Sequence, residues 1–420
     1  MTASVELRAR VMAALHHQRD ALVALCAALG RQDSQNPPGD TSSIAAVCLD
    51  ALTGVTGVSA DYATRRAPIV NVVARVTGAS PGRRLVLNGH LDIAQLVVAD
   101  GWTFPPFGGV TENGRIYGRG ITDMKAGIAA EVMAARILGA FADELHGELV
   151  LTLAGDEGTG AENGTLHLLR NVPHATGDAM LSGDVGSPEV IRFGEKGYAW
   201  IEVIARGKAA GGAHTYLGIN AIDRLVAALP SVTALNGYAD TLPAEVARAI
   251  EAASKQSEAI AGAGETAALR GMTVNVGRIG GGNRPNAVPP EARAMLDIRF
   301  PPGVTVRRVH QLVSDALANH PGLSCELHAH ADPTWSDPAH ELADLIRANA
   351  TAILGHSPAT TIRAGFSDAR FYREHGIPSF GYGVTPHNGA APDEYVETDD
   401  LWTVCAVHTL TALDYLTASE

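Results

Sequence analysis

The chain has 420 residues, of which 46% are hydrophobic and 18% are charged, a composition that is ordinary for a globular protein. At roughly 100 to 200 residues per domain, this length predicts two domains. The formal net charge of -13 argues against nucleic-acid or anionic-membrane partners, because both depend on basic patches, so we expect a small-molecule substrate or another protein.

The cysteines and the N-terminus indicate where the protein works. The four cysteines show no CxxC pair and no regular spacing, which is typical of a reducing compartment and argues against a structural zinc site. Residues 1–30 mix charged residues into an apolar pattern, so they predict one amphipathic helix and no signal peptide. No stretch approaches the roughly 18 uninterrupted apolar residues of a membrane helix. We therefore expect a cytoplasmic protein with no membrane partner.

The first half of the chain alternates short apolar runs with amphipathic helices. We expect strands at 68–76, 83–93, 147–157 and 177–184, and helices at 43–52, 124–141 and 165–172. This alternation is the signature of a parallel or mixed sheet that helices cover on both faces. Residues 1–194 therefore form the first part of an α/β domain.

The pattern changes near residue 194. Strands are expected at 198–207, 272–280, 291–300 and 324–330, and helices at 220–229 and 306–320. Their order, β-α-β-β-α-β, is that of a ferredoxin-like unit. Residues 195–330 thus form a second, α+β domain inserted in the first. The α/β pattern resumes in residues 331–420, which complete the first domain with helices at 340–354 and 401–416.

Ionisable residues follow several of the expected strands of the first domain. They are His90, Asp92, Asp156, Glu157 and Asp184, joined by Asp123 at the start of a helix. Each alone has an ordinary explanation: Asp123 is a plausible helix N-cap, and Glu157 a solvated loop carboxylate. In open α/β sheets, however, ligands bind outside the carboxyl ends of the strands, so these side chains should converge.

A metal ion would explain such a cluster. Several carboxylates in one cleft repel each other unless a cation compensates them. An imidazole with carboxylate oxygens suits zinc or manganese, and the Asp92 carboxylate could hold the far ring nitrogen of His90. A carboxylate that does not ligate the metal could then deprotonate water. Nucleotide-binding and serine-hydrolase motifs are absent: GRGITD lacks the third glycine, and no GxSxG occurs.

A series of motifs lies in order along nearly the whole chain: GHLDI, GRGITDMKAG, DEG, SGD, EKGYAWIEVIARGKAA, LGINAI, NAVPPEARAMLDIR, GFSDARFY and PDEYV. On these motifs the chain matches one family. The chain resembles the metallohydrolases that include acetylornithine deacetylase, succinyl-diaminopimelate desuccinylase, carboxypeptidase G and the aminoacylases. The resemblance implies a mixed-sheet catalytic domain covered by helices, with an inserted ferredoxin-like lid and dimerisation domain.

The resemblance implies a role for each residue of the cluster. His90, Asp123 and Asp184 would ligate a divalent metal, zinc or manganese, and Asp123 would precede a cis peptide to Met124. Glu157 would be the general base, and Asp92 is the other candidate catalytic residue. The lid residues Asn286 and Arg299 would face the substrate, with Arg299 gripping a carboxylate as an arginine fork can.

Three positions depart from the family pattern. The family places a second Glu where this chain has Gly158, and a His where it has Ala390, and both would ligate the same second metal. We therefore expect a single metal ion, with His387 as an alternative ligand through a shifted loop. The lid has Gly211 where relatives place an oxyanion-stabilising His, and His214 is the candidate replacement.

These departures leave three functional hypotheses. The family default is hydrolysis of an amide, an N-acyl amino acid or a peptide, in a small substrate that bears a carboxylate. The second is hydrolytic deamination of an activated aromatic amine, the reaction of a relative, 5-nitroanthranilate aminohydrolase, because fewer devices remain to polarise an amide carbonyl. The third is a retired enzyme that serves as a binding protein. The resemblance also implies a homodimer or higher homo-oligomer through the lid.

Overall fold

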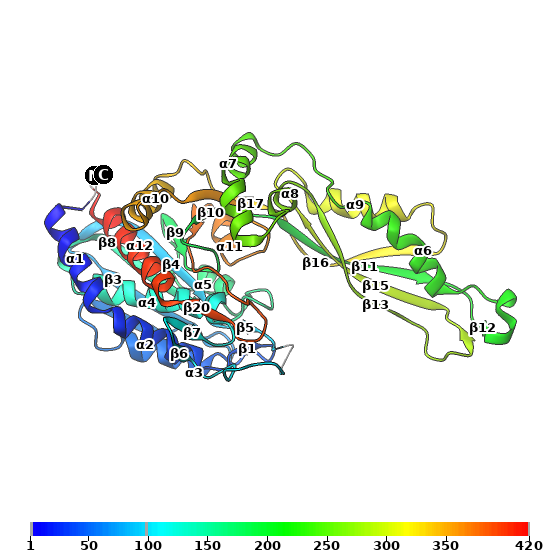
Figure 1. Ribbon diagram of the computed structural model, residues 1–420, viewed down its shortest axis with the longest axis horizontal. Helices are drawn as coiled ribbons and strands as arrows, with labels where there is room; N and C mark the ends of the chain where they lie inside the picture. The colour runs from blue at the N-terminus through cyan, green and yellow to red at the C-terminus, as the bar shows by residue number, and fades with distance from the viewer. Residues whose placement is uncertain (1–2, 97–99, 419–420) are drawn as a thin grey trace. The chain divides into compact units, whose positions relative to one another are not determined.

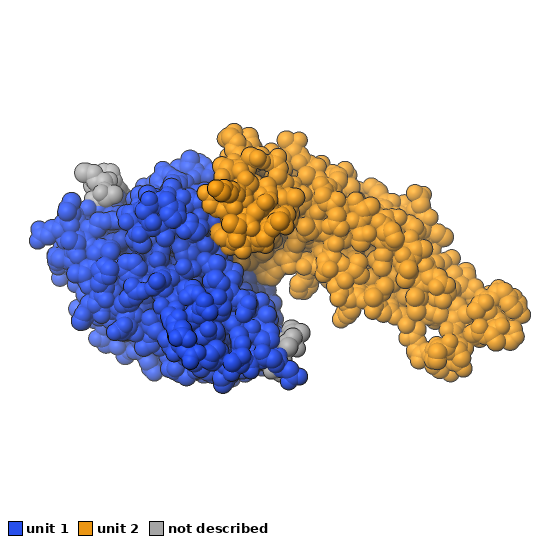
Figure 2. All heavy atoms as spheres, viewed as in Figure 1, with its two compact units in different colours: residues 1–193, 336–360, 367–420 blue, residues 194–335, 361–366 orange. Residues whose placement is uncertain are grey.

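The computed structural model describes residues 3–96 and 100–418, and the chain in it forms two compact units (Figure 2). The first unit comprises residues 1–193, 336–360 and 367–420, and the second comprises residues 194–335 and 361–366. The sequence placed the two breaks after residues 194 and 330, whereas the units divide after residues 193 and 335.

The first unit is built on a mixed sheet (Figure 1). Its strand order is β10-β19-β9-β4-β8-β3-β2, and the central strands β19, β9, β4 and β8 run parallel while β10, β3 and β2 pair antiparallel at the two sides. The strands are β2 (Val58–Tyr62), β3 (Val72–Thr77), β4 (Ser80–His90), β8 (His146–Ala154), β9 (Ala179–Ser182), β10 (Val190–Glu195) and β19 (Ser379–Gly381). The parallel centre directs the carboxyl ends of β4, β8 and β9 to one edge.

Helices cover both faces of this sheet. Val86 of β4 packs in one hydrophobic cluster with Leu166 of α5 and Phe371 of α11. Successive side chains point to opposite faces, and on the other face α4 and α12 lie against β4 and β8. The helices are α1 (Val5–His17), α2 (Arg19–Gly30), α3 (Ser42–Leu52), α4 (Ala126–Gly139), α5 (Thr165–Asn171), α10 (Glu341–Leu354), α11 (Ala369–Glu374) and α12 (Thr398–Thr417). The α/β fold class is confirmed.

The single N-terminal helix that we expected is two helices. The chain turns at Gln18, which ends α1 and precedes α2. Both helices pack on α4 and α12, and α2 also packs on β7 and on the segment around Asp123. Residues 1 and 2 of the expected helix lie outside the described residues.

Several short elements surround the carboxyl edge of the sheet. β1 pairs with β5, and β20, β7 and β6 form a three-stranded sheet. These elements are β1 (Gln35–Asn36), β5 (Ile93–Ala94), β6 (Val110–Glu112), β7 (Arg115–Tyr117), β20 (Tyr395–Glu397), and the helical turns η1 (Ile121–Lys125) and η2 (Ala142–Glu144). Two further strands, β17 (Thr334–Trp335) and β18 (Ala359–Arg363), lie where the chain passes between the units.

The second unit is an antiparallel sheet with strand order β13-β15-β11-β16. Its chain order of β11, α6, β13, β15, α9 and β16 is the expected ferredoxin-like order. One face of β11 and β15 packs with α6 and α9 in a single hydrophobic cluster. The elements are β11 (Gly197–Arg206), β12 (Ala210–Gly211), η3 (Gly212–Leu217), α6 (Ala221–Thr233), α7 (Ala244–Ala261), α8 (Glu265–Arg270), β13 (Thr273–Gly281), β14 (Ala287–Val288), β15 (Glu291–Phe300), α9 (Val306–Leu317) and β16 (Leu323–Ala331).

The length and composition of the helices can be compared with those of a membrane-spanning helix. Among residues 3–96 and 100–418, no helix combines the length and the apolar composition that crossing a bilayer requires.

Candidate active site

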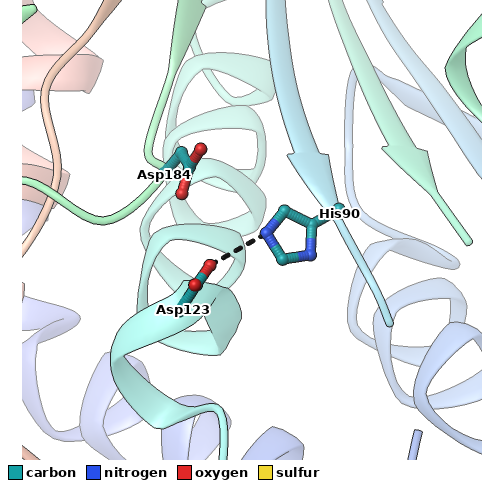
Figure 3. A group of neighbouring side chains, drawn as sticks. All are labelled: His90, Asp123 and Asp184. Carbon is teal, nitrogen blue, oxygen red and sulfur yellow. Dashed lines mark hydrogen bonds and ion pairs between the residues drawn. The ribbon is translucent and has the colours of Figure 1, made fainter. Parts of the chain in front are cut away.

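Three of the expected residues converge at the carboxyl edge of the sheet in the first unit. His90 ends β4, Asp184 follows β9, and Asp123 lies in the turn η1 that precedes α4. One ligand atom from each lies within 4.8 Å of the others, and Figure 3 shows the three side chains pointing toward one another. His90 Nε2 lies 3.0 Å from Asp123 Oδ1. His90 and Asp184 are buried, whereas the Asp123 side chain is exposed.

Strand register explains this convergence. β4 and β9 are parallel neighbours, and Asn88 pairs with Ser182, so the residues two positions further along each strand meet at the same edge. Asp123 is not on a strand but in the turn η1, before α4. The peptide bond from Asp123 to Met124 is cis, as the family resemblance implies.

The backbone of Asp92 holds the far nitrogen of His90, and this corrects the expectation that its carboxylate would do so. His90 Nδ1 lies 2.7 Å from the Asp92 carbonyl oxygen, while the Asp92 carboxylate is 4.0 Å away. A carbonyl oxygen only accepts, so Nδ1 carries a proton, and Nε2 is the ring nitrogen that faces the two aspartates and could bind a metal. The tautomer suits a metal ligand.

The Asp92 carboxylate instead holds the turn that begins at Glu157. It accepts the backbone N–H groups of Glu157 and Gly158, each at 3.0 Å, and the side-chain amide of Asn36 at 2.8 Å. Asp92 is almost fully buried. A Cβ atom at Gly158 would lie 3.4 Å from Asp92 Oδ2, in ordinary van der Waals contact. Asp92 therefore places the backbone of the candidate base.

Glu157 has an environment that suits a general base. Burial raises the pKa of Glu157 well above its ordinary value, and the carboxylates of Asp368, Asp92 and Asp184 act in the same direction while His90 opposes them. A base works best when its pKa is near the working pH, and a carboxylate needs such a shift to approach neutrality. Its neighbour Asp156 has another task, because its carboxylate accepts two hydrogen bonds from Asn163 and holds the loop.

Asp368 is one residue near the site to which the sequence assigned no role. It is buried, and its Oδ2 accepts the Thr165 hydroxyl at 2.7 Å. Burial raises the pKa of Asp368 to about 6. The motif GFSDARFY contains this residue, but no spacing within the sequence links it to Glu157, which lies 211 residues earlier.

The donor set fits a divalent metal. Burial lowers the pKa of His90, but Asp123, Glu157 and Asp184 raise it well above its ordinary value, so the surroundings of the imidazole strongly favour positive charge. One imidazole and two carboxylates are the ligand types of zinc and manganese. Three protein ligands leave room for water or substrate, as catalytic zinc sites require.

The proposed second-metal positions carry no ligand in the described part of the chain. Gly158 has no side chain, and Ala390 has a left-handed backbone with φ 60°. The ring of His387 stacks on Tyr395 at a centroid distance of 4.5 Å, and His387 is not part of the group formed by the three donors. Glu394 of the PDEYV motif is fully buried and accepts hydrogen bonds from residues 119, 120 and 122, so its role there is structural.

The expected substrate-binding residues lie in the second unit. Arg299 donates to both carboxylate oxygens of Asp297, at 2.8 and 3.1 Å, and its guanidinium lies over the rings of Tyr198 and Phe366. The backbone carbonyl of Asn286 accepts the N–H of Gly212. His214 is exposed in η3 beside Tyr216, at a ring centroid distance of 6.0 Å. The guanidinium group of Arg299, the candidate for binding a substrate carboxylate, is thus hydrogen-bonded to Asp297 in this structure.

Comparison with known proteins defines the class. The family model for peptidase family M20/M25/M40 matches residues 86–414, so the chain belongs to this family and is a metal-dependent hydrolase. Succinyl-diaminopimelate desuccinylase from Ruegeria pomeroyi is 29% identical over 388 residues, which cover 87% of this chain and 91% of that protein.

Two solved structures share the fold. The M20 family metallo-carboxypeptidase Sso-CP2 from Sulfolobus solfataricus superposes with a TM-score of 0.76 at 20% identity, over 95% of this chain and 99% of that one. A dinuclear metal binding peptidase of the M20 family from Bacillus subtilis superposes with a TM-score of 0.61 at 13% identity, over 96% and 99%. The family resemblance seen in the motifs is confirmed.

Proposed function

We propose that this protein hydrolyses an amide bond in a small substrate that bears a carboxylate, such as an N-acyl amino acid or a peptide. The observation that carries the proposal is the convergence of His90, Asp123 and Asp184, with Glu157 close enough for its charge to act on His90. The names of the relatives support it, because one is a desuccinylase and another a metallo-carboxypeptidase.

The residues of the site would divide the reaction as follows. His90, Asp123 and Asp184 would hold a divalent metal, which would supply Lewis-acid chemistry for acidifying water and polarising the scissile carbonyl. Glu157 takes a proton from the attacking water and returns it to the departing nitrogen. Asp92 keeps the Glu157 backbone in place through two hydrogen bonds. In the second unit, Arg299, Asn286 and His214 are the candidates for binding the substrate.

We further propose that one metal ion per subunit suffices. Gly158 and Ala390 supply no side-chain ligand, and His387 is engaged with Tyr395. Elemental analysis of protein purified without chelator, repeated after addition of zinc or manganese, tests this. A plateau at one equivalent with full activity supports the single site, and a plateau at two requires a ligand that restores the pair.

Hydrolytic deamination of an activated aromatic amine is the second candidate. The observation that favours it is the combined loss of side-chain ligands at Gly158 and Ala390 and of an imidazole at Gly211, which leaves fewer groups to polarise an amide. A screen of N-acyl amino acids and dipeptides against aminobenzoates separates the two. Release of ammonia from aminobenzoates with no amide cleavage would exclude the first candidate.

The second unit also offers a surface for a homodimer. β13 is an edge strand of its sheet, and an exposed apolar surface lies on β13 and on α6, with Ile279 51%, Val226 54% and Ile222 36% exposed. An edge strand with apolar neighbours pairs readily with a second copy around a twofold axis. We propose that the lid dimerises through this surface.

A further inference from the structure

Glu131 is a carboxyl group in the middle of a buried apolar helix. It lies on α4, where its neighbours are Ala, Val, Ile and Met, and its exposed fraction is 0%. Burying a carboxyl group in such surroundings costs free energy unless its polar atoms are used. The functional roles proposed above do not involve it.

The carboxyl group of Glu131 lies between the ends of two strands that carry metal-donor residues. Its Oε1 accepts the N–H of Gly183 at 2.7 Å, and Gly183 directly precedes Asp184. Its Oε2 is buried, with no hydrogen-bond partner among the described residues, and lies beside Gly89, which directly precedes His90.

The glycines on both sides make room for this carboxyl group. A Cβ atom at Gly89 would come within 3.0 Å of Glu131 Oε2, and one at Gly183 would come within 3.2 Å of Oε1. A side chain at Gly89 would also press on Met124 Cε at 2.8 Å, and one at Gly183 on Gly127 Cα at 2.9 Å, so the two glycines allow close packing that includes the carboxyl group. The helix of Glu131 also begins three residues after Asp123, the third donor. The carboxyl group therefore contacts the residue before Asp184 and lies beside the residue before His90, and its helix follows the third donor.

We propose that Glu131 is a positioning residue that sets the spacing of His90 and Asp184, and so holds the donor atoms at the separation of one metal ion. The inference rests on the proposed metal site. Outer groups that orient metal ligands typically matter about 10- to 100-fold in metal affinity or activity.

The chemistry of the site predicts which substitutions are tolerated. Burial raises the pKa of the Glu131 carboxyl to about 8. A glutamine has the same size and offers an oxygen to the Gly183 N–H, so it should preserve the spacing. An alanine leaves a cavity and an unsatisfied N–H group, and a methionine fills the space but accepts no strong hydrogen bond.

The test compares four variants with the wild type: E131Q, E131A, E131M and M133A. Met133 lies on the same helix and is 2% exposed, but it lines a hollow with Ala14 and Phe141 away from the donors, so M133A is a matched cavity control. Zinc affinity is measured by calorimetry. Hydrogen exchange of residues 180–186 is measured in the metal-free protein, and thermal unfolding reports stability.

We expect E131A and E131M to bind zinc about 10- to 100-fold more weakly and to exchange faster at residues 180–186. E131Q should keep the zinc affinity within about threefold, and M133A should lose stability without losing zinc affinity. Should E131A not fold, E131M decides. Equal zinc affinity and exchange in E131M, E131A and M133A would overturn the inference. A wild type that binds no zinc would refute the proposed metal site, and the exchange data would still decide whether Glu131 positions the strand end.

Discussion

Replacing Asp92 with Asn separates two roles that an aspartate near a metal-binding histidine can have. The partner of His90 Nδ1 is the backbone carbonyl of residue 92, which the substitution retains. The Asp92 carboxylate accepts the backbone N–H groups of Glu157 and Gly158, and this is what the substitution damages. We therefore expect D92N to keep its metal and lose turnover.

The size of the effect follows from these hydrogen bonds. Asparagine has one acceptor oxygen in place of two, so one N–H loses its charged acceptor and the other keeps only a neutral one. A hydrogen bond to a charged group contributes about 1.5–3 kcal/mol and a neutral one about 1 kcal/mol, which makes the loss about 2–5 kcal/mol. If the loss falls on the transition state, kcat/KM falls roughly 30- to 5,000-fold.

The assay is kcat/KM on the amide substrate that the screen identifies, with metal content measured on the same samples. Asp414 supplies the control, because its buried carboxylate accepts hydrogen bonds from Ala3, Arg8 and Asn349. D414N should lower stability and leave kcat/KM of the folded enzyme unchanged. The reasoning is refuted if D92N loses its metal in proportion to its activity, or if D92N and D414N lose kcat/KM equally.

Three further predictions address the base, a buried histidine and the dimer surface. E157Q removes the proton acceptor and should reduce kcat by at least about 100-fold with unchanged metal content, and intact turnover would refute the proposed mechanism. Burial lowers the pKa of His408 from 6.5 to about 4. The unfolded chain therefore binds a proton between pH 6.5 and 4 that the folded chain does not, and the free energy of unfolding falls by about 3 kcal/mol from pH 7 to 4. In H408Q, denaturant titrations should lack this part of the decline, and an equal decline would contradict the assignment. V226D places a charge on the exposed surface of α6 and should convert the dimer to a monomer in sedimentation, while D223N on the same helix should not; a monomeric wild type would remove the proposed interface.

Local patterns in the sequence were enough to predict the fold class and the candidate donors. The change from alternating strands and helices to the order β-α-β-β-α-β predicted a different sheet in each unit. It could do so because the spacing of apolar residues in a strand or helix indicates which of its faces is buried. His90 and Asp184 follow apolar strands, and parallel strands end at one edge, so their proximity was predictable from position alone. Asp123 joined them through the motif GRGITDMKAG.

Only the tertiary structure decided how these residues are held. The break at Gln18 accompanies the additional packing of α2 on β7 and on the segment around Asp123, which the helical period of residues 1–30 does not encode. The Asp92 carboxylate accepts a hydrogen bond from the backbone of Glu157, 65 residues later in the chain. Asp368, 211 residues after Glu157, raises the pKa of Glu157 through its charge.

Glu131 shows the physical reason most clearly. Its sequence context is an ordinary buried helix, and its contacts with Gly89 and Gly183 exist only when α4 packs under two strands in the observed register. Residue type and periodicity determine which side chains are buried and which elements form. Packing between segments distant in the chain determines which atoms meet, and hydrogen-bond partners at the site depend on those meetings.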